Sequence, residues 1–130
     1  MWVRLPPAAP VKDNMTVFVF GSNLAGRHGA GAAVAARNDW GAKYGVGRGP
    51  TGRAYAIPTK DEFLMSMSLE SIQHYVNEFI EYAKANPTIE FMVTRIGCGL
   101  AGYTDEQIAP MFRGAPKNCY FDSRWSSYLT

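Results

Sequence analysis

Residues 16–37 read TVFVFGSNLAGRHGAGAAVAAR, and this stretch indicates the fold. Its first part, Thr16–Phe20, is β-branched and aromatic and ends at Gly21, a pattern typical of a buried strand in a parallel sheet. Glycines then interrupt the chain as far as Gly31, which indicates a loop. The segment Ala32–Arg37, mostly alanine, predicts the start of a helix. The stretch therefore predicts a strand, a glycine-rich loop and a helix in succession.

A second unit of the same kind lies further along the chain. Phe91–Ile96 is an apolar run that predicts a strand, and the loop Gly97–Gly102 follows it. Thr104 and Gln107 then form a capping-box pattern, which predicts a helix as far as Arg113. Both glycine loops thus follow a strand and precede a helix.

The remaining segments complete the alternation of strands and helices. Residues 41–52 contain so many glycines that they predict a loop, and Tyr55–Ile57 predicts a short strand that stops at Pro58. Ser68–Ala85 has apolar residues at the three-to-four spacing of an amphipathic helix, with Ser68 as its cap. Asn118–Phe121 predicts a last strand. We therefore expect a three-layer α/β/α domain with a mostly parallel sheet.

Length and composition are those of one globular domain. The chain has 130 residues, and 47% hydrophobic residues are enough for a core without disulfides or metal. Residues 1–14, rich in proline, are expected to form an extended leader, and residues 15–130 the domain. A net charge of +2 with scattered basic residues fits an anionic small molecule. It does not provide the basic stripe of a nucleic-acid binder.

The two cysteines, Cys98 and Cys119, indicate a reducing compartment. They are too few for a disulfide framework and lack the spacing of a zinc site. We therefore expect a cytoplasmic protein with no metal and no cofactor. No apolar run reaches the roughly 18 residues of a membrane span, so no membrane partner is expected. The composition does not indicate an oligomeric state.

The two glycine loops predict a site for a diphosphate. Glycines allow positive φ and let backbone N–H groups approach a ligand closely. Successive N–H groups at a helix N-terminus form an anion-binding concavity, and ligands of parallel sheets bind beyond the carboxyl ends of the strands. Both loops would open at that edge. The residues expected to bind the ligand are Ser22, Asn23, His28, Gly29, Ala30, Gly31, Ala32, Gly97, Cys98, Gly99, Leu100, Ala101, Gly102 and Tyr103. Of these, Gly99 is expected to need positive φ.

Both loops resemble those of macro domains. Ser22–Ala33 is similar to the macro-domain loop that runs from an asparagine into a small-residue triplet, and Ile96–Tyr103 is similar to the second phosphate loop. Three segments resemble the branch that removes ADP-ribose from protein glutamate or DNA bases: His28–Gly31, Tyr55–Lys60 and Arg95–Leu100. The overlap covers about residues 16–121. Small phage and bacterial proteins, to which no activity is assigned, share these motifs.

The resemblance implies a phosphate and ribose cradle but an incomplete catalytic set. In that branch a lysine after the middle strand attacks the ribose, and Lys60 matches it. The aspartate that assists the lysine corresponds to Ala101, which cannot act as an acid or base. Asp105 lies four residues further on, in the predicted helix cap. The family's aspartate that holds adenine would precede the first strand, where Asp13 is the nearest.

Several residues allow more than one interpretation. Lys60 is a candidate nucleophile or a phosphate counter-charge, and His28 either donates to a phosphate or is satisfied by the backbone. Cys98 fits packing better than reactivity. Tyr103, and less strongly Trp40, could stack on a base or ribose. The basic residues of the 41–52 segment and its surroundings, Lys43, Arg48 and Arg53, form either a mobile lid or an ordinary solvated loop.

Four functions remain open at this stage. The favoured one is a module that senses or sequesters an ADP-ribose-type nucleotide without turnover. An ADP-ribosyl hydrolase that uses Lys60 is the second, with nucleic acid expected only as an ADP-ribosylated substrate. The third is a Rossmann-like nucleotide phosphoribohydrolase, which the segment Phe18–Ser22 also resembles, although the arginine–glutamate catalytic motif is missing. The fourth, a purely structural role, leaves the glycine loops without a purpose.

Overall fold

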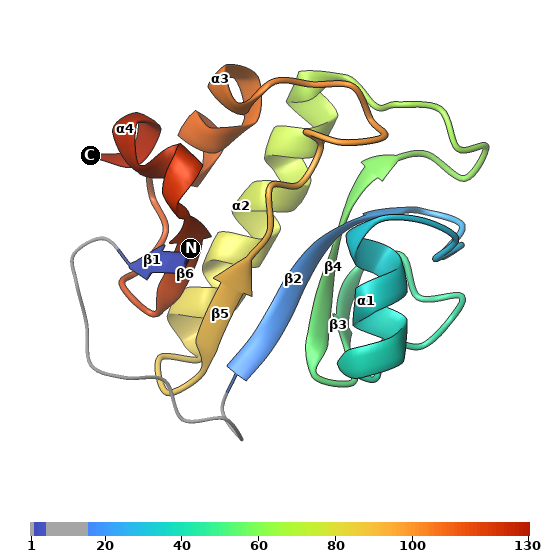
Figure 1. Cartoon of the computed structure of the whole chain (residues 1–130), viewed down its shortest axis with the longest axis horizontal. Coiled ribbons are helices and arrows are strands. Elements are labelled where there is room, and N and C mark those ends of the chain that lie inside the picture. The colour runs from blue at the N-terminus through green and yellow to red at the C-terminus, as the bar shows by residue number, and fades with distance from the viewer. Residues whose placement is uncertain (1, 5–15) are drawn as a thin grey trace.

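The computed structural model describes residues 2–4 and 16–130 of the chain (Figure 1). Its strands are β1 (Trp2–Arg4), β2 (Thr16–Asn23), β3 (Gly49–Thr51), β4 (Ala54–Lys60), β5 (Glu90–Val93) and β6 (Cys119–Asp122). Its helices are α1 (Ala32–Asp39), α2 (Leu69–Ala85), α3 (Asp105–Ile108) and α4 (Ser126–Leu129), with 3-10 turns η2 (Ala109–Phe112) and η3 (Ser123–Trp125). The sheet order is β1-β6-β5-β2-β4-β3. The inner pairings are parallel and the two edge pairings antiparallel, so the sheet is mostly parallel, as predicted.

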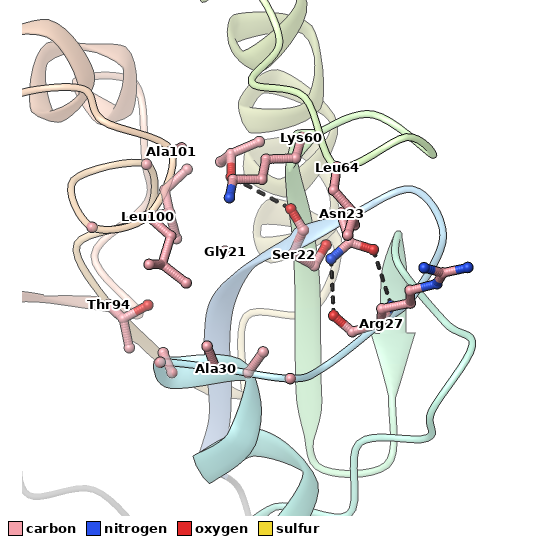
Figure 2. A pocket seen from close by; sticks show the side chains of 18 of the residues that line it. Gly21, Ser22, Asn23, Arg27, Ala30, Lys60, Leu64, Thr94, Leu100 and Ala101 are labelled. Atoms are coloured by element: carbon pink, nitrogen blue, oxygen red, sulfur yellow. Dashed lines mark hydrogen bonds between the residues drawn. The ribbon is translucent and has the colours of Figure 1, made fainter.

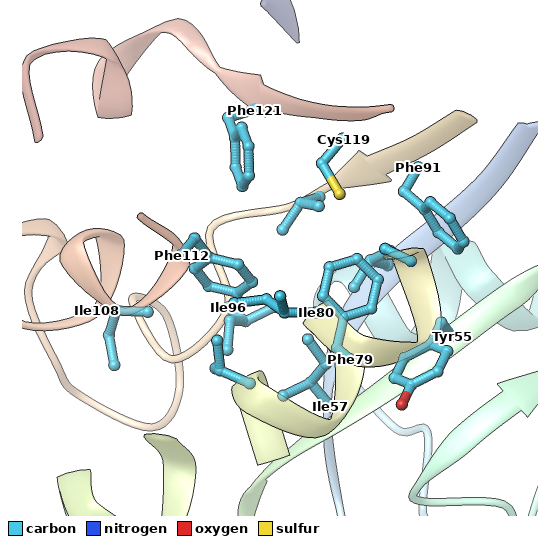
Figure 3. Close-up of a cluster of buried hydrophobic side chains, with 14 of the residues drawn as sticks. Tyr55, Ile57, Phe79, Ile80, Phe91, Ile96, Ile108, Phe112, Cys119 and Phe121 are labelled. Carbon is cyan, nitrogen blue, oxygen red and sulfur yellow. The ribbon is translucent and has the colours of Figure 1, made fainter. Parts of the chain in front are cut away.

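Helices cover both faces of the sheet, which gives the three predicted layers. Side chains alternate between the faces of a strand, and in β2 Phe18 and Phe20 pack with Ala33 and Ala36 of α1. Val19 belongs to the larger core on the opposite face, where α2 packs. Figure 3 shows this second core, in which Phe79 lies close to the rings of Tyr55, Phe91 and Phe112.

Helix α2 forms as its sequence predicts. The Ser68 hydroxyl accepts a hydrogen bond from the N–H of Ser71 and so caps the first turn. The residues that α2 buries recur at helical spacing: Ile72, Val76, Phe79, Ile80 and Ala83. The helix ends at Asn86, whose backbone N–H donates to the carbonyl of Ala83.

Two strand predictions are corrected by the structure. Strand β4 does not stop at Pro58 but continues to Lys60, because Ser22 pairs with Pro58 and Asn23 with Lys60 on the β2 side. On its other side, β3 pairs only with Ala54–Ala56, so the proline lies beyond that ladder. Strand β5 is shorter than predicted and ends at Val93, after which the chain turns toward the second glycine loop.

The glycine-rich segment and the C-terminal elements also differ in detail. Strand β3 lies within residues 41–52, where the sequence predicted only a loop. The capping box of Thr104 and Gln107 is present, but α3 ends at Ile108 and continues as η2. Pro110 lies in that turn and lacks the N–H that a continuous α-helix needs. The last strand, β6, is shifted by one residue from the prediction.

Part of the expected leader pairs with the sheet. Trp2, Val3 and Arg4 form β1, which runs antiparallel to β6. The rest of that segment, including Asp13, lies outside the described residues. Among the described helices, none has the length and apolar character to cross a bilayer.

Candidate functional site

A cavity of about 710 Å³ lies at the carboxyl ends of β2, β4 and β5 (Figure 2). This size is within the range of small-molecule sites. Eleven of the residues singled out in the sequence line it: Ser22, Asn23, Gly29, Ala30, Gly31, Ala32, Lys60, Gly97, Gly99, Leu100 and Ala101. Four others do not: His28, Cys98, Gly102 and Tyr103. The structure thus brings both glycine loops and Lys60 to one cavity.

The first loop presents backbone donors at the start of α1. Gly31 caps the helix with φ 63° and ψ −145°, a conformation that is essentially restricted to glycine, and no side chain caps this end. The N–H groups of Gly29, Ala30, Gly31 and Ala32 donate to no backbone carbonyl in the described part of the chain. A side chain at Gly29 or Gly31 would meet open space, since nothing lies within 4 Å of a Cβ there. This loop therefore has the donors and the room that an anion requires.

The second loop also presents backbone N–H donors, but the prediction of positive φ at Gly99 is wrong. Gly97 and Gly102 have positive φ, whereas Gly99, expected to need it, does not. A Cβ on Gly97 would also lie 3.1 Å from Cδ1 of Ile108, so close packing restricts this position. The N–H groups of Gly99, Leu100 and Ala101 donate to no backbone acceptor among residues 2–4 and 16–130. Both loops therefore offer N–H groups around the same cavity.

Polar side chains of the first loop brace it. The amide of Asn23 donates to the carbonyl of Arg27 at 2.9 Å and accepts from the N–H of Arg27 at 3.0 Å (Figure 2). The Ser22 hydroxyl donates to the carbonyl of Gly47. These two side chains line the cavity, but their hydrogen bonds fix the shape of the loop.

The glycine-rich segment packs behind the first loop and contributes Tyr44 to the cavity lining. A Cβ on Gly47 would lie 1.9 Å from the carbonyl oxygen of Asn23, and one on Gly26 would lie 2.2 Å from the backbone of Gly45. Lys43, Arg48 and Arg53 are absent from the lining residues in the described chain, which argues against a lid built from them. Arg48 instead forms a bidentate ion pair with Glu78 on α2.

His28 joins the two segments. It is buried, and its Nε2 lies 3.0 Å from the carbonyl oxygen of Val46. Because a carbonyl can only accept, Nε2 carries the proton, and Nδ1 has no partner within the described residues. Burial lowers the pKa of His28, so the ring is neutral. The backbone therefore satisfies one ring nitrogen of His28, and His28 is not among the residues that line the cavity in the described chain.

Two residues of the second loop also turn toward the protein. Burial, followed by a hydrogen bond to Asp105, raises the pKa of the Cys98 thiol to about 12, which fits packing and not reactivity. The Tyr103 hydroxyl donates to the carbonyl of Met67 at 2.5 Å. Tyr103 therefore ties the second loop to the segment before α2.

Asp105 anchors the start of the second loop. Its carboxylate accepts two hydrogen bonds from Arg95, at 2.8 and 2.6 Å, and one from Nε1 of Trp125 at 2.7 Å. The Arg95 contact, with smaller contributions from Trp125 and Cys98, lowers the pKa of Asp105 to about 2. Arg95 lines the cavity, and sequence reasoning quoted it in a motif without assigning it a site role.

The charged side chains around the cavity are all cationic. They are Arg27, Lys60 and Arg95, and no Asp or Glu is among the lining residues in the part of the chain that is described. Figure 2 shows the Lys60 side chain directed into the cavity from the end of β4. The described part of the chain contains no group of three or more His, Cys, Asp or Glu side chains that could hold a metal ion. The site is therefore suited to an anionic ligand and lacks a carboxylate for acid–base chemistry.

Comparison with known proteins supports the architecture. No family model and no curated protein matches the chain. A solved structure of Thermosipho africanus DarTG in complex with ADP-ribose matches with a TM-score of 0.60 over 86% of this chain, at 15% sequence identity. The fold is macro-domain-like. The macro-domain-like chain spans 39% of the length of that DarTG chain, and at this identity the likeness concerns the fold alone.

Proposed function

We propose that this chain binds an ADP-ribose-type nucleotide, with its diphosphate between the two glycine loops, as a sensor or sequestering protein. The observation that carries the proposal is the pair of N–H rows, at Gly29–Ala32 and Gly99–Ala101, that line one cavity. Three cationic side chains, of which Arg95 is paired with Asp105, accompany them, and no described carboxylate lines the cavity. The similar DarTG structure contains ADP-ribose, which agrees with this choice of ligand.

Binding without turnover follows from the missing carboxylate. A positioned acid or base typically contributes about 10²–10⁴-fold to the rate of such a reaction. Ala101 provides none, and the carboxylate of Asp105 is held by Arg95 and Trp125. Its low pKa leaves it ionised and makes it a weak base, so it neither supplies nor readily takes up a proton near neutral pH.

One observation favours a second candidate, an ADP-ribosyl hydrolase. Lys60 ends β4 and lines the cavity, which is where a nucleophilic amine would have to lie. Release of ADP-ribose from modified glutamate or DNA distinguishes the candidates. The binding proposal expects no release above a buffer control.

Calorimetry with ADP-ribose tests the binding site directly. Gly31→Glu places a carboxylate among the N–H donors and should abolish binding, because it adds bulk and negative charge to the anion site. Gly41→Glu is the matched control, since Gly41 is also an exposed glycine with positive φ but does not line the cavity. The control should bind like the native chain. Equal affinity of a folded Gly31→Glu variant would contradict the site.

A further inference from the structure

The large exposed apolar side chains gather at the cavity. In the described chain these are Tyr44, Phe63, Leu64, Met65 and Leu100. Tyr44, Leu64 and Leu100 line the cavity, and Phe63 and Met65 flank Leu64 in sequence. Phe63 is 76% exposed and Leu100 70%. An exposed apolar patch that is confined to one place on a surface is typical of an interaction site.

The segment that carries three of these side chains has a defined conformation. The Asp61 carboxylate accepts hydrogen bonds from the N–H groups of Phe63 and Met65, at 2.9 and 3.0 Å. The Asp61 N–H also donates to the carbonyl of Met65 at 2.8 Å. Among the described non-glycine residues, Leu64 alone has positive φ, at 66°. The loop thus holds its apolar side chains outward at a conformational cost, and such strain is frequent at functional sites.

This loop is fixed to the second glycine loop. The Ser66 hydroxyl donates to the carbonyl of Ala101 at 2.8 Å, and Lys60 and Ser66 form an isolated bridge. In the view of Figure 2, the Lys60 amine lies between Leu64 and Leu100. Leu64 and Leu100 thus line the cavity near Lys60, and we call them, together with Phe63 and Met65, the exposed neighbours of Leu64 in the chain, the apolar collar.

We propose that the collar binds a polypeptide that carries the nucleotide, by contacting apolar residues next to the modified residue. This inference rests on the proposed function. Phe63 and Met65 do not line the cavity, so a small ligand inside it would leave them in water. A group that extends from the cavity would cover them.

Charge on the loop favours a polypeptide over a nucleic acid. Asp61 and the exposed Glu62 lie next to Phe63 and outnumber the one cation of this loop, Lys60, so the loop would repel a phosphodiester backbone that passes over the collar. Uncharged apolar side chains meet no such repulsion. The collar therefore fits an apolar peptide segment.

The test measures affinity for three ligands joined to ADP-ribose by a linkage that resists hydrolysis. They are a peptide with leucine and valine flanks, the same peptide with serine and glycine flanks, and a single-stranded oligonucleotide; free ADP-ribose is the reference. The native chain should bind the apolar peptide about tenfold more tightly than free ADP-ribose. The polar peptide should bind like free ADP-ribose.

Phe63→Ser/Met65→Ser should remove the preference for the apolar peptide and leave the affinity for free ADP-ribose unchanged. Glu81→Ser/Lys84→Ser, on the exposed surface of α2, is the matched control and should retain the preference. If free ADP-ribose binds but flanking residues have no effect, or the oligonucleotide binds best, the collar assignment is wrong. If the native chain binds no ADP-ribose at all, the proposed function fails and this inference fails with it.

Discussion

Replacing Asp105 by asparagine should destabilise the fold by about 2 kcal/mol near neutral pH. The interactions of this carboxylate lower its pKa from 3.8 to about 2. At 1.36 kcal/mol per pKa unit, this shift corresponds to roughly 2.4 kcal/mol. The Asp105 side chain is 23% exposed, so solvent screening reduces the figure slightly. Asparagine keeps one acceptor for Arg95 or Trp125 but loses the charge, which accounts for most of the effect.

The pH dependence gives the sharper test. Because the pKa is lower in the folded state, the stabilisation by Asp105 is complete above the unfolded pKa of 3.8 and is lost as the pH falls through about 2. Urea unfolding should therefore show a stability difference between the native chain and Asp105→Asn that is full at pH 7 and shrinks below about pH 4.

A control variant separates this half-buried network from an ordinary surface ion pair. Glu81 pairs with Lys84 at 3.4 Å on the exposed face of α2, and such pairs contribute about 0–1 kcal/mol. Glu81→Gln should accordingly change the free energy of unfolding little. If Asp105→Asn costs no more than Glu81→Gln, or if its cost does not change with pH, the network does not hold the second loop.

The remaining predictions concern the second loop and turnover. Gly102→Ala should cost about 1–3 kcal/mol in urea unfolding, since Gly102 has φ 85°, whereas Gly99→Ala should stay within about 0.5 kcal/mol; equal costs would contradict the backbone geometry. Lys60→Ala should weaken ADP-ribose binding by roughly 1.5–3 kcal/mol in calorimetry through loss of a charge-assisted contact, and a larger affinity in the variant would refute that contact. Ala101→Asp supplies the missing carboxylate and should create slow release of ADP-ribose from modified glutamate. Robust release by the native chain that is lost in Lys60→Ala would instead favour the hydrolase.

Sequence patterns within one segment, such as helix caps and apolar spacing, predicted the helices and strands that depend on that segment alone. The apolar spacing and serine cap of α2, the capping box of α3 and the β-branched and aromatic run of β2 lie within single segments. Strand ends were less predictable, because a partner strand decides them. Pro58 looked like a terminator, yet pairing with β2 carries β4 past it to Lys60.

The residues of the candidate site also divide into those that a sequence pattern identified and those that no local pattern marks. The glycine patterns identified both loops, and the resemblance to macro domains singled out Lys60. Residues of both loops and Lys60 line one cavity. Arg27, Tyr44 and Leu64 also line it, but no local pattern distinguishes them from ordinary loop residues. For His28 the sequence left two interpretations open, a donor to a phosphate and a residue satisfied by the backbone, and in the fold its Nε2 donates to the carbonyl of Val46.

The glycines behind the first loop hold one wall of the cavity in place. The basic residues of the glycine-rich segment left a mobile lid and an ordinary solvated loop equally open. In the structure, the missing side chain of Gly47 lets the backbone approach Asn23, and that of Gly26 lets it approach Gly45. A hydrogen bond from the N–H of Gly45 to the carbonyl of Gly26, at 2.9 Å, joins the same segments. A loop held in this way loses little conformational freedom when it binds an anion, so less of the interaction energy is spent on ordering. The glycines of this protein therefore serve two purposes: some expose N–H groups to a ligand, and others hold those groups in place.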